Sequence, residues 1–175
     1  MRVENRGRVM GISRLNHAVF YVRNIAVTKR FYAEVLGFAT VIEDEGGRFL
    51  FMRASASTNH HDIAFFAIGD GAADNSAGRV GASGRVHVGL YHVAWQVESI
   101  IELEHMRRKL VEAGALVGAS DHGVSKSLYG VDPDGAEFEI MWVVPPSMWG
   151  DMEHESIIEP LDLAREITRY AEIIE

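Results

Sequence analysis

The chain repeats itself at an interval of 75 residues. Residues 15–22 align with residues 90–97: both runs are short, apolar and rich in residues that favour strands, and each is interrupted at the same place by a histidine, His17 or His92. A lone histidine in an apolar strand is more often a hydrogen-bonded core or surface residue than a ligand. Two histidines at equivalent positions of a repeat have to be interpreted together, because the repeat relates their places in the fold.

Each half is predicted to be a β-α-β-β-β module. Helical spacing follows the first strand and ends near Gly37 in one half and near Gly114 in the other. Further strands are expected at 48–53 and 62–68, then at 116–118, 127–131 and 137–144, with Asp132-Pro133-Asp134-Gly135 as a turn before the last. The predicted fold class is therefore α+β, with modules of about 13–68 and 89–144 forming one domain, residues 1–146.

Two segments lie outside these modules. Residues 69–88 are rich in Gly, Ala and Ser and have no apolar periodicity, so we expect a flexible loop there, either a lid over a site or a plain solvated linker. The tail, residues 147–175, follows Pro145-Pro146 and carries apolar residues from Ile158 to Tyr170 at the spacing of an amphipathic helix. We expect this helix to pack on the domain or on a partner subunit.

Composition and charge exclude several classes of protein. The length of 175 residues and the hydrophobic content of 47% suit one domain with a real core. A net charge of -8 without a basic stripe argues against nucleic-acid binding. No apolar run could cross a bilayer and the N-terminus does not resemble a signal peptide, so we expect a cytoplasmic protein. Cysteine is absent, so any metal must be held by nitrogen and oxygen.

The repeat suggests a metal site. Two modules related by a pseudo-twofold axis can bring His17 and His92 to one point, and a carboxylate from a late strand would complete the set. Glu139 lies among bulky apolar residues, where a carboxylate is costly unless it is paired or bound to a metal. Glu137 would share its face in an ideal strand, so periodicity leaves these two glutamates open.

The paired modules, the two histidines and the run 121–139 (DHGVSKSLYGVDPDGAEFE) resemble the vicinal oxygen chelate superfamily, and within it the extradiol catechol dioxygenases. The resemblance covers about residues 13–144 and implies that the two modules pair into one domain with a curved mixed sheet around a metal site. In that superfamily the metal-binding glutamate follows the turn at the position of Glu139, which favours Glu139 over Glu137. The family usually has Asn or His after the turn glycine, where this chain has Ala136; that departure affects the turn and not the ligands.

The resemblance implies a function as well as a fold. It implies a single iron(II), with manganese(II) as the alternative, held by His17, His92 and Glu139, and a reaction that opens a catechol-type ring with dioxygen. It makes His61 the acid–base group beside bound oxygen, with His60 as its rival, because an imidazole titrates near neutrality. His122 and Tyr129 would contact the substrate hydroxyls. His87, His105 and His154 receive no role, and a homo-oligomer, dimeric or higher, is expected by analogy.

Other members of the superfamily remain alternatives. Fosfomycin-inactivating thiol transferases share the His, His, Glu set but need basic residues to hold a phosphonate, and this chain has no Arg or Lys between Glu139 and Arg165. Lactoylglutathione lyases take a second glutamate from the end of the first module, where this chain reads Ala64-Phe65-Phe66-Ala67-Ile68. A non-catalytic small-molecule binding protein is the alternative from another class, since fold alone does not separate these functions.

Overall fold

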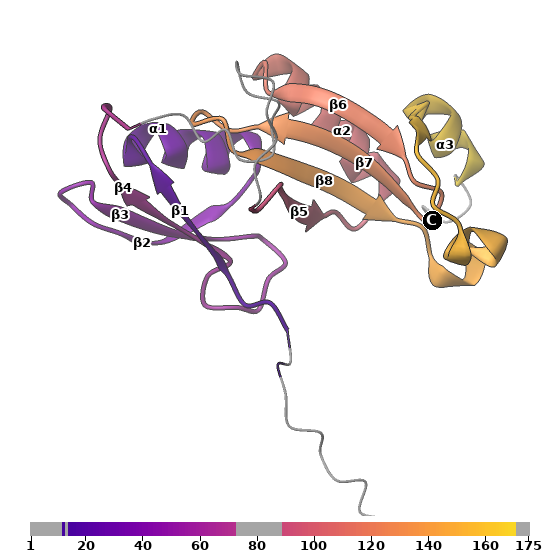
Figure 1. Cartoon of the computed structure of the whole chain (residues 1–175), viewed down its shortest axis with the longest axis horizontal. Coiled ribbons are helices and arrows are strands. Elements are labelled where there is room, and N and C mark those ends of the chain that lie inside the picture. The colour runs from indigo at the N-terminus through magenta and orange to yellow at the C-terminus, as the bar shows by residue number, and fades with distance from the viewer. Residues whose placement is uncertain (1–11, 13, 73–88, 171–175) are drawn as a thin grey trace, which may run out of the picture.

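The computed structural model describes residues 12, 14–72 and 89–170, and it shows two α+β halves that follow each other along the chain (Figure 1). The first half contains β1 (Ala18–Val22), α1 (Ile25–Arg30), η1 (Phe31–Val35), β2 (Ala39–Glu43), β3 (Phe49–Arg53) and β4 (Ile63–Ala67). The second contains β5 (Val93–Gln96), α2 (Ile100–Glu112), β6 (Leu116–Asp121), β7 (Ser125–Val131) and β8 (Glu137–Val143). The tail adds η2 (Pro146–Met148), η3 (Gly150–His154), β9 (Glu159–Pro160) and α3 (Leu163–Arg169).

Two mixed sheets form the frame of the molecule. The first has the strand order β1-β4-β3-β2 and the second the order β5-β8-β7-β6-β9. In each sheet the first strand of the module runs parallel to the last, and the remaining module strands are antiparallel. The strands that follow His17 and His92 are therefore both edge strands. The predicted α+β class and the duplicated βαβββ module are confirmed.

The helices form where local signals favour them. Asn24 caps α1 by accepting hydrogen bonds from the backbone N–H groups of Ala26 and Val27, and Ser99 and Glu102 form a capping box at the start of α2. Gly37, with a φ of +78°, ends the first helical segment in a conformation that side chains other than glycine rarely adopt. Both helices therefore begin and end at signals that the sequence carries.

The core consists of two clusters joined by shared aromatic and aliphatic side chains. One cluster packs α1 and η1 on the first sheet, and the other packs α2 and α3 on the second. Phe31, Leu36 and Trp95 pack against both clusters. Each sheet therefore buries one face under helices and leaves the opposite face uncovered by helices. No helix of the described residues is long and apolar enough to cross a membrane.

The turn between β7 and β8 also joins the two halves. Asp132 Oδ1 accepts hydrogen bonds from the backbone N–H groups of Asp134 and Ala136, and the Tyr32 hydroxyl of the first half donates to Asp132 Oδ2 over 3.4 Å. Asp134 pairs with Arg23 at 3.0 Å. Burial raises the pKa of Asp132 to about 6. The predicted turn is therefore a contact between the modules.

The raised pKa of Asp132 makes stability depend on pH. An aspartate in the unfolded chain has a pKa of about 4, so protonation of Asp132 stabilises the native state relative to the unfolded state. This stabilisation is complete below about pH 4 and is lost as the pH rises through about 6. We expect Asp132→Asn, which keeps an oxygen for the turn, to raise the free energy of unfolding by up to about 2–3 kcal/mol at neutral pH and not at about pH 4. Urea unfolding at the two pH values checks this. An equal gain at both would contradict it, and exposed Asp151→Asn is the control.

The C-terminal tail packs on the second module through a buried charge cluster. Lys126 on β7 is fully buried, and its Nζ lies 2.5 Å from Asp121 Oδ1 and 3.1 Å from Glu166 Oε2 of α3. The aromatic ring of Tyr170, also buried, lies beside the same ammonium group. A second contact comes from β9, which pairs with β6. The expectation that the tail packs on the domain is confirmed, but its helix is shorter than predicted, since Ile158 lies before β9 and is exposed.

Lys126 should be important for stability because it neutralises two buried carboxylates. Lys126→Met removes the buried cation between Asp121 and Glu166 and leaves them only the half-exposed guanidinium groups of Arg165 and Arg169. We expect it to lower the free energy of unfolding by about 3–5 kcal/mol. Lys29→Met is the matched control, because Lys29 pairs with Glu43 on the surface and such pairs contribute at most about 1 kcal/mol. Urea denaturation of both variants checks the prediction. Equal effects of the two substitutions would contradict it.

Candidate functional site

The second module places His92 and Glu139 together on its uncovered face. His92 precedes β5, and the pairing of β5 with β8 sets Ala94 opposite Glu139, so the two side chains share one face of the sheet. His92 Nε2 lies 3.0 Å from Glu139 Oε2. Glu139 is only 8% exposed, and His92 Nδ1 is buried without a hydrogen-bond partner among the described residues. The protein alone therefore leaves one nitrogen of this ring unsatisfied.

Glu137, which sequence periodicity left open, has a different partner. It lies on the same face as Glu139 but accepts a hydrogen bond from the hydroxyl of Tyr91, and that bond raises the pKa of Tyr91. Glu139 is the carboxylate beside His92. The geometry thus gives the two glutamates different surroundings, which the sequence alone could not do.

Tyr129 and His122 lie on the same uncovered face, next to Glu139. Tyr129 on β7 is directly opposite Glu139 on β8, and its ring centroid is 5.8 Å from that of His92. Its hydroxyl lies 2.8 Å from His122 Nε2. Burial and the charge of Glu139 raise the pKa of Tyr129, while the hydroxyls of Ser120 and Ser127 oppose that rise. Tyr129 is therefore a neutral phenol at physiological pH.

The first module gathers the other three histidines of interest. The ring centroids of His17 and His61 are 4.5 Å apart, and His61 Nδ1 lies 3.0 Å from His60 Nδ1. His61 also stacks on Phe51. Burial lowers the pKa of His61, and the neighbouring imidazoles of His17 and His60 lower it further. His61 is thus a neutral base at pH 7.

An aromatic face extends from these histidines across the first sheet, and we define it as Val19, Tyr21, Phe49, Phe51 and Phe66. The register of β1, β4 and β3 puts its members on one side, away from the helices, and three ring pairs on it have centroids within 6.3 Å of each other. Tyr21 is 72% exposed and Val19 55% exposed. A surface of this kind could cover the ring of an apolar aromatic ligand.

The described residues do not bring the three predicted ligands into one group. His92 and Glu139 are together, whereas His17 lies with His61 on the first sheet, and no cluster of three or more potential ligands occurs in residues 12, 14–72 and 89–170. The spacing of the pair does fit a metal: two ligands about 2.1 Å from one ion in neighbouring positions lie about 3 Å apart. Two of the three predicted ligands, His92 and Glu139, therefore lie together within one chain.

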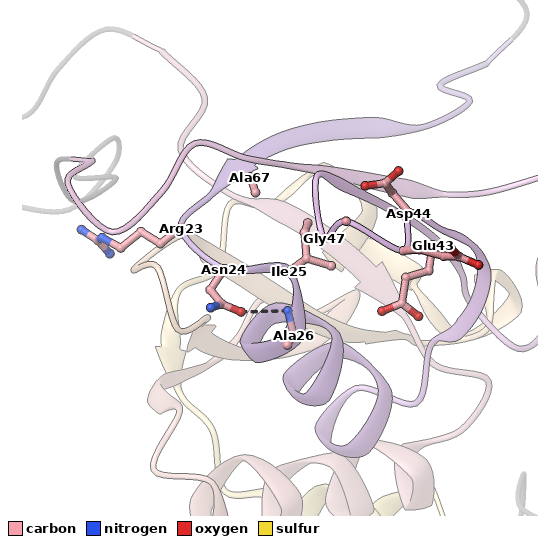
Figure 2. Close-up of a pocket in the computed structure, with 10 residues that line it drawn as sticks. Arg23, Asn24, Ile25, Ala26, Glu43, Asp44, Gly47 and Ala67 are labelled. Atoms are coloured by element: carbon pink, nitrogen blue, oxygen red, sulfur yellow. Dashed lines mark hydrogen bonds between the residues drawn. The ribbon is translucent and has the colours of Figure 1, made fainter.

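The remaining histidines, and a pocket beside the start of α1, offer no comparable group of potential ligands or acid–base residues. His105 and His154 are exposed, and His87 lies outside the described residues. A pocket beside the start of α1 is lined by Arg23, Asn24, Glu43, Asp44 and neighbours (Figure 2). Asn24 is engaged in capping the helix, and Glu43 and Asp44 are paired with Lys29 and Arg48. None of the predicted site residues lines this pocket, so we assign it no function.

Sequence reasoning missed several residues beside the predicted site. Ser120 and Ser127 lie on the uncovered face with Tyr129, and Tyr91 holds Glu137. The alternation Ser125, Ser127, Tyr129 along one strand could have indicated the serines, because alternate residues share a face. The backbone carbonyl of Ile157, which contacts His122, left no signal in the sequence.

Paired βαβββ modules with a histidine and a glutamate on an uncovered sheet face define the class of vicinal oxygen chelate folds. Comparison with known proteins agrees: the model of the Glyoxalase/Bleomycin resistance protein/Dioxygenase superfamily matches residues 14–140. The chain belongs to this superfamily.

Individual relatives are more distant. A catechol-2,3-dioxygenase of Bacillus subtilis (strain 168) is 26% identical over 135 residues, which cover 77% of this chain and 43% of the relative. The match therefore spans less than half of that protein.

Solved structures show the same fold at low identity. A glyoxalase/dioxygenase from Nostoc punctiforme has a TM-score of 0.63 at 13% identity, covering 82% of this chain and 100% of that one. A domain from Frankia sp. EAN1pec has a TM-score of 0.59 at 21% identity, covering 78% and 96%. The fosfomycin resistance protein FosX from Listeria monocytogenes has a TM-score of 0.55 at 18% identity, covering 77% and 96%. These neighbours establish the fold alone.

Proposed function

We propose that this chain is an extradiol dioxygenase that uses iron(II) and dioxygen to open a catechol-type ring. The observation that carries the proposal is the pair of His92 and Glu139 on the uncovered face, with the Tyr129 hydroxyl and His122 next to it. The aromatic face of the first module gives further support, because it offers apolar surface for an aromatic ring. The similarity to the Bacillus dioxygenase favours the same reaction class.

His92 and Glu139 would hold the metal, and His17 would be the third ligand. Two imidazoles and one carboxylate suit iron(II) and leave neighbouring positions where a chelating diol and dioxygen could bind side by side. Manganese(II) fits the same donors. The 3.0 Å spacing of His92 Nε2 and Glu139 Oε2 supports this assignment, because two donors in neighbouring positions on one ion lie about that far apart.

The surrounding side chains would position the substrate and move its protons. Tyr129 and His122 lie where they could hold a diol hydroxyl, and the neutral His61 could take up a proton and return it. The aromatic face would orient the ring and exclude water from it. In this arrangement, chemistry takes place between the uncovered faces of the two sheets.

We propose that His17 comes from the partner subunit of a homodimer. His17 and His92 adjoin edge strands, β1 and β5, whose outer edges pair with no other strand of the described residues. Exposed apolar side chains surround both edges: Leu15, Val19 and Tyr21 on one, Leu90 and Tyr91 on the other. Placing β1 of one copy against β5 of another would bury these side chains and bring His17 of the partner subunit to His92 and Glu139.

Mixing two inactive variants tests the shared site. We expect His17→Ala and Glu139→Ala each to be inactive. If His17 is supplied by the partner, a mixed dimer has one intact site and one doubly altered site. Random exchange should restore about a quarter of wild-type turnover, since half of the dimers are mixed and half of their sites are intact. No recovery after unfolding and refolding the two together would place all three ligands in one chain.

Turnover on catechols tests the activity itself. The protein is purified without oxygen, loaded with iron(II), and assayed in air against a panel of substituted catechols, following oxygen uptake and the yellow ring-opened product. We expect turnover with iron and little without it, and parallel loading with manganese identifies the preferred metal. Fosfomycin with a thiol serves as the competing substrate. No iron retained and no catechol consumed would overturn the proposal in favour of a binding protein or another member of the superfamily.

A further inference from the structure

The C-terminal tail returns to the uncovered face beside His122. Trp149 Nε1 donates a hydrogen bond to the carbonyl of Val144, and β9 pairs with β6 through Ser120 opposite Pro160 and Asp121 opposite Glu159. Ile157, between these two anchors, packs on Gly123: a Cβ at Gly123 would lie 2.8 Å from Ile157 Cδ1. The tail therefore holds the backbone of Ile157 against the His122 loop.

A short hydrogen-bonded chain begins at that backbone. The Ile157 carbonyl oxygen lies 3.0 Å from His122 Nδ1, and His122 Nε2 lies 2.8 Å from the Tyr129 hydroxyl. A carbonyl oxygen can only accept, so His122 Nδ1 must carry the proton that this bond uses. In the neutral ring Nε2 is then an acceptor, and the Tyr129 O–H must donate to it.

We propose that the Ile157 carbonyl is a positioning group that fixes the tautomer of His122 and thereby the direction of the Tyr129 O–H bond. Tyr129 then presents only lone pairs to the space next to Glu139. It can accept a hydrogen bond from a ligand hydroxyl but has no proton to donate. On the proposed function, on which this last step rests, the site selects a diol that binds with a protonated hydroxyl toward Tyr129. The tail is thus part of the site.

Nitrogen-15 NMR of the metal-free full-length protein reads the tautomer directly, without any turnover. Spectra are recorded at about pH 8.5, above the ordinary pKa range of histidine. We expect the pattern of an Nδ1-protonated ring for His122. Tyr129→Phe should keep this pattern, because the carbonyl and not the phenol sets it. An Nε2-protonated ring in the wild-type protein would overturn the proposal.

Gly123→Ala tests the role of the tail. Its Cβ would lie 2.8 Å from Ile157 Cδ1 and 3.4–3.5 Å from atoms of Met152, so we expect the His122 loop to move away from the Ile157 carbonyl. Gly150→Ala is the matched control: Gly150 also has a positive φ, of 52°, but a Cβ there meets nothing within 4 Å. We expect the first variant to lose the Nδ1-protonated pattern and the second to keep it. Adding Ile157→Ala to Gly123→Ala removes the collision and should restore it. An unchanged tautomer in Gly123→Ala would overturn the proposal.

The activity measurement separates this inference from the proposed function. In iron-loaded enzyme, Gly123→Ala should raise the KM for the catechol severalfold with a smaller change in kcat, and the double variant should recover. If no catechol is turned over by the wild type, the proposed function fails while the NMR result still decides the tautomer. If the wild type is active but its His122 is Nε2-protonated, this inference fails alone.

Discussion

The His61→Ala variant should keep its iron and lose its turnover. Its ring lies 4.5 Å from that of His17 and stacks on Phe51, and its lowered pKa leaves it neutral and ready to accept a proton. General acid–base catalysis contributes about 10²–10⁴-fold, so we expect kcat to fall by about that factor with iron content unchanged. Iron analysis and oxygen uptake on the same sample measure both quantities.

His60→Ala is the control for this substitution, because His60 is the exposed neighbour of His61. We expect it to keep most of the turnover. Loss of iron in His61→Ala would mean that His61 is a ligand. Loss of turnover in His60→Ala with an active His61→Ala would exchange the roles of the two residues.

Glu139→Ala should abolish iron binding, whereas Glu137→Ala should retain it. Glu139 is buried and lies 3.0 Å from His92 Nε2, while Glu137 accepts a hydrogen bond from Tyr91. Loss of outer residues around a metal typically costs about 10–100-fold in affinity, so loss of a ligand should cost at least about a hundredfold. Anaerobic titration with iron(II) compares the two variants, which differ by two positions on one strand face. Equal affinities would remove Glu139 from the ligand set.

Much of the fold could be predicted from the sequence because its signals are local. The 75-residue repeat indicated two equivalent modules, and Gly37 and Gly114 mark the ends of the helices. No strand was predicted between Gly37 and Arg48, although β2 lies there and its run Thr40-Val41-Ile42 is β-branched. Strand β6 extends to Asp121, three residues past its predicted end, because pairing with β7 and β9 stabilises Ser120 and Asp121.

The tail shows where helical spacing misleads. Ile158 and Leu161 fit the apolar spacing of a helix with Leu163, but Pro160 has no backbone N–H and α3 begins only at Leu163. The segment before α3 is instead held by β9 on β6. Most of the predicted flexible loop, residues 73–88, lies outside the described part of the chain.

The sequence indicates candidate site residues one at a time but not how they assemble. The repeat places His17 and His92 at equivalent points of two modules, and alternation places Glu139 on the face of His92. Neither signal specifies how two modules face each other, because that depends on contacts between elements far apart in sequence or on different chains. The separation of His17 from the pair follows from this tertiary arrangement.

The fate of dioxygen tests the central claim most directly. Iron-loaded protein is given a catechol that it consumes in an atmosphere of oxygen-18, and the product is analysed by mass spectrometry. We predict that each ring-opened molecule carries two oxygen-18 atoms and that its formation requires iron. A product without oxygen-18 in its new carboxylate, or the absence of iron-dependent oxygen uptake with every catechol, would contradict the assignment of this site to a dioxygenase.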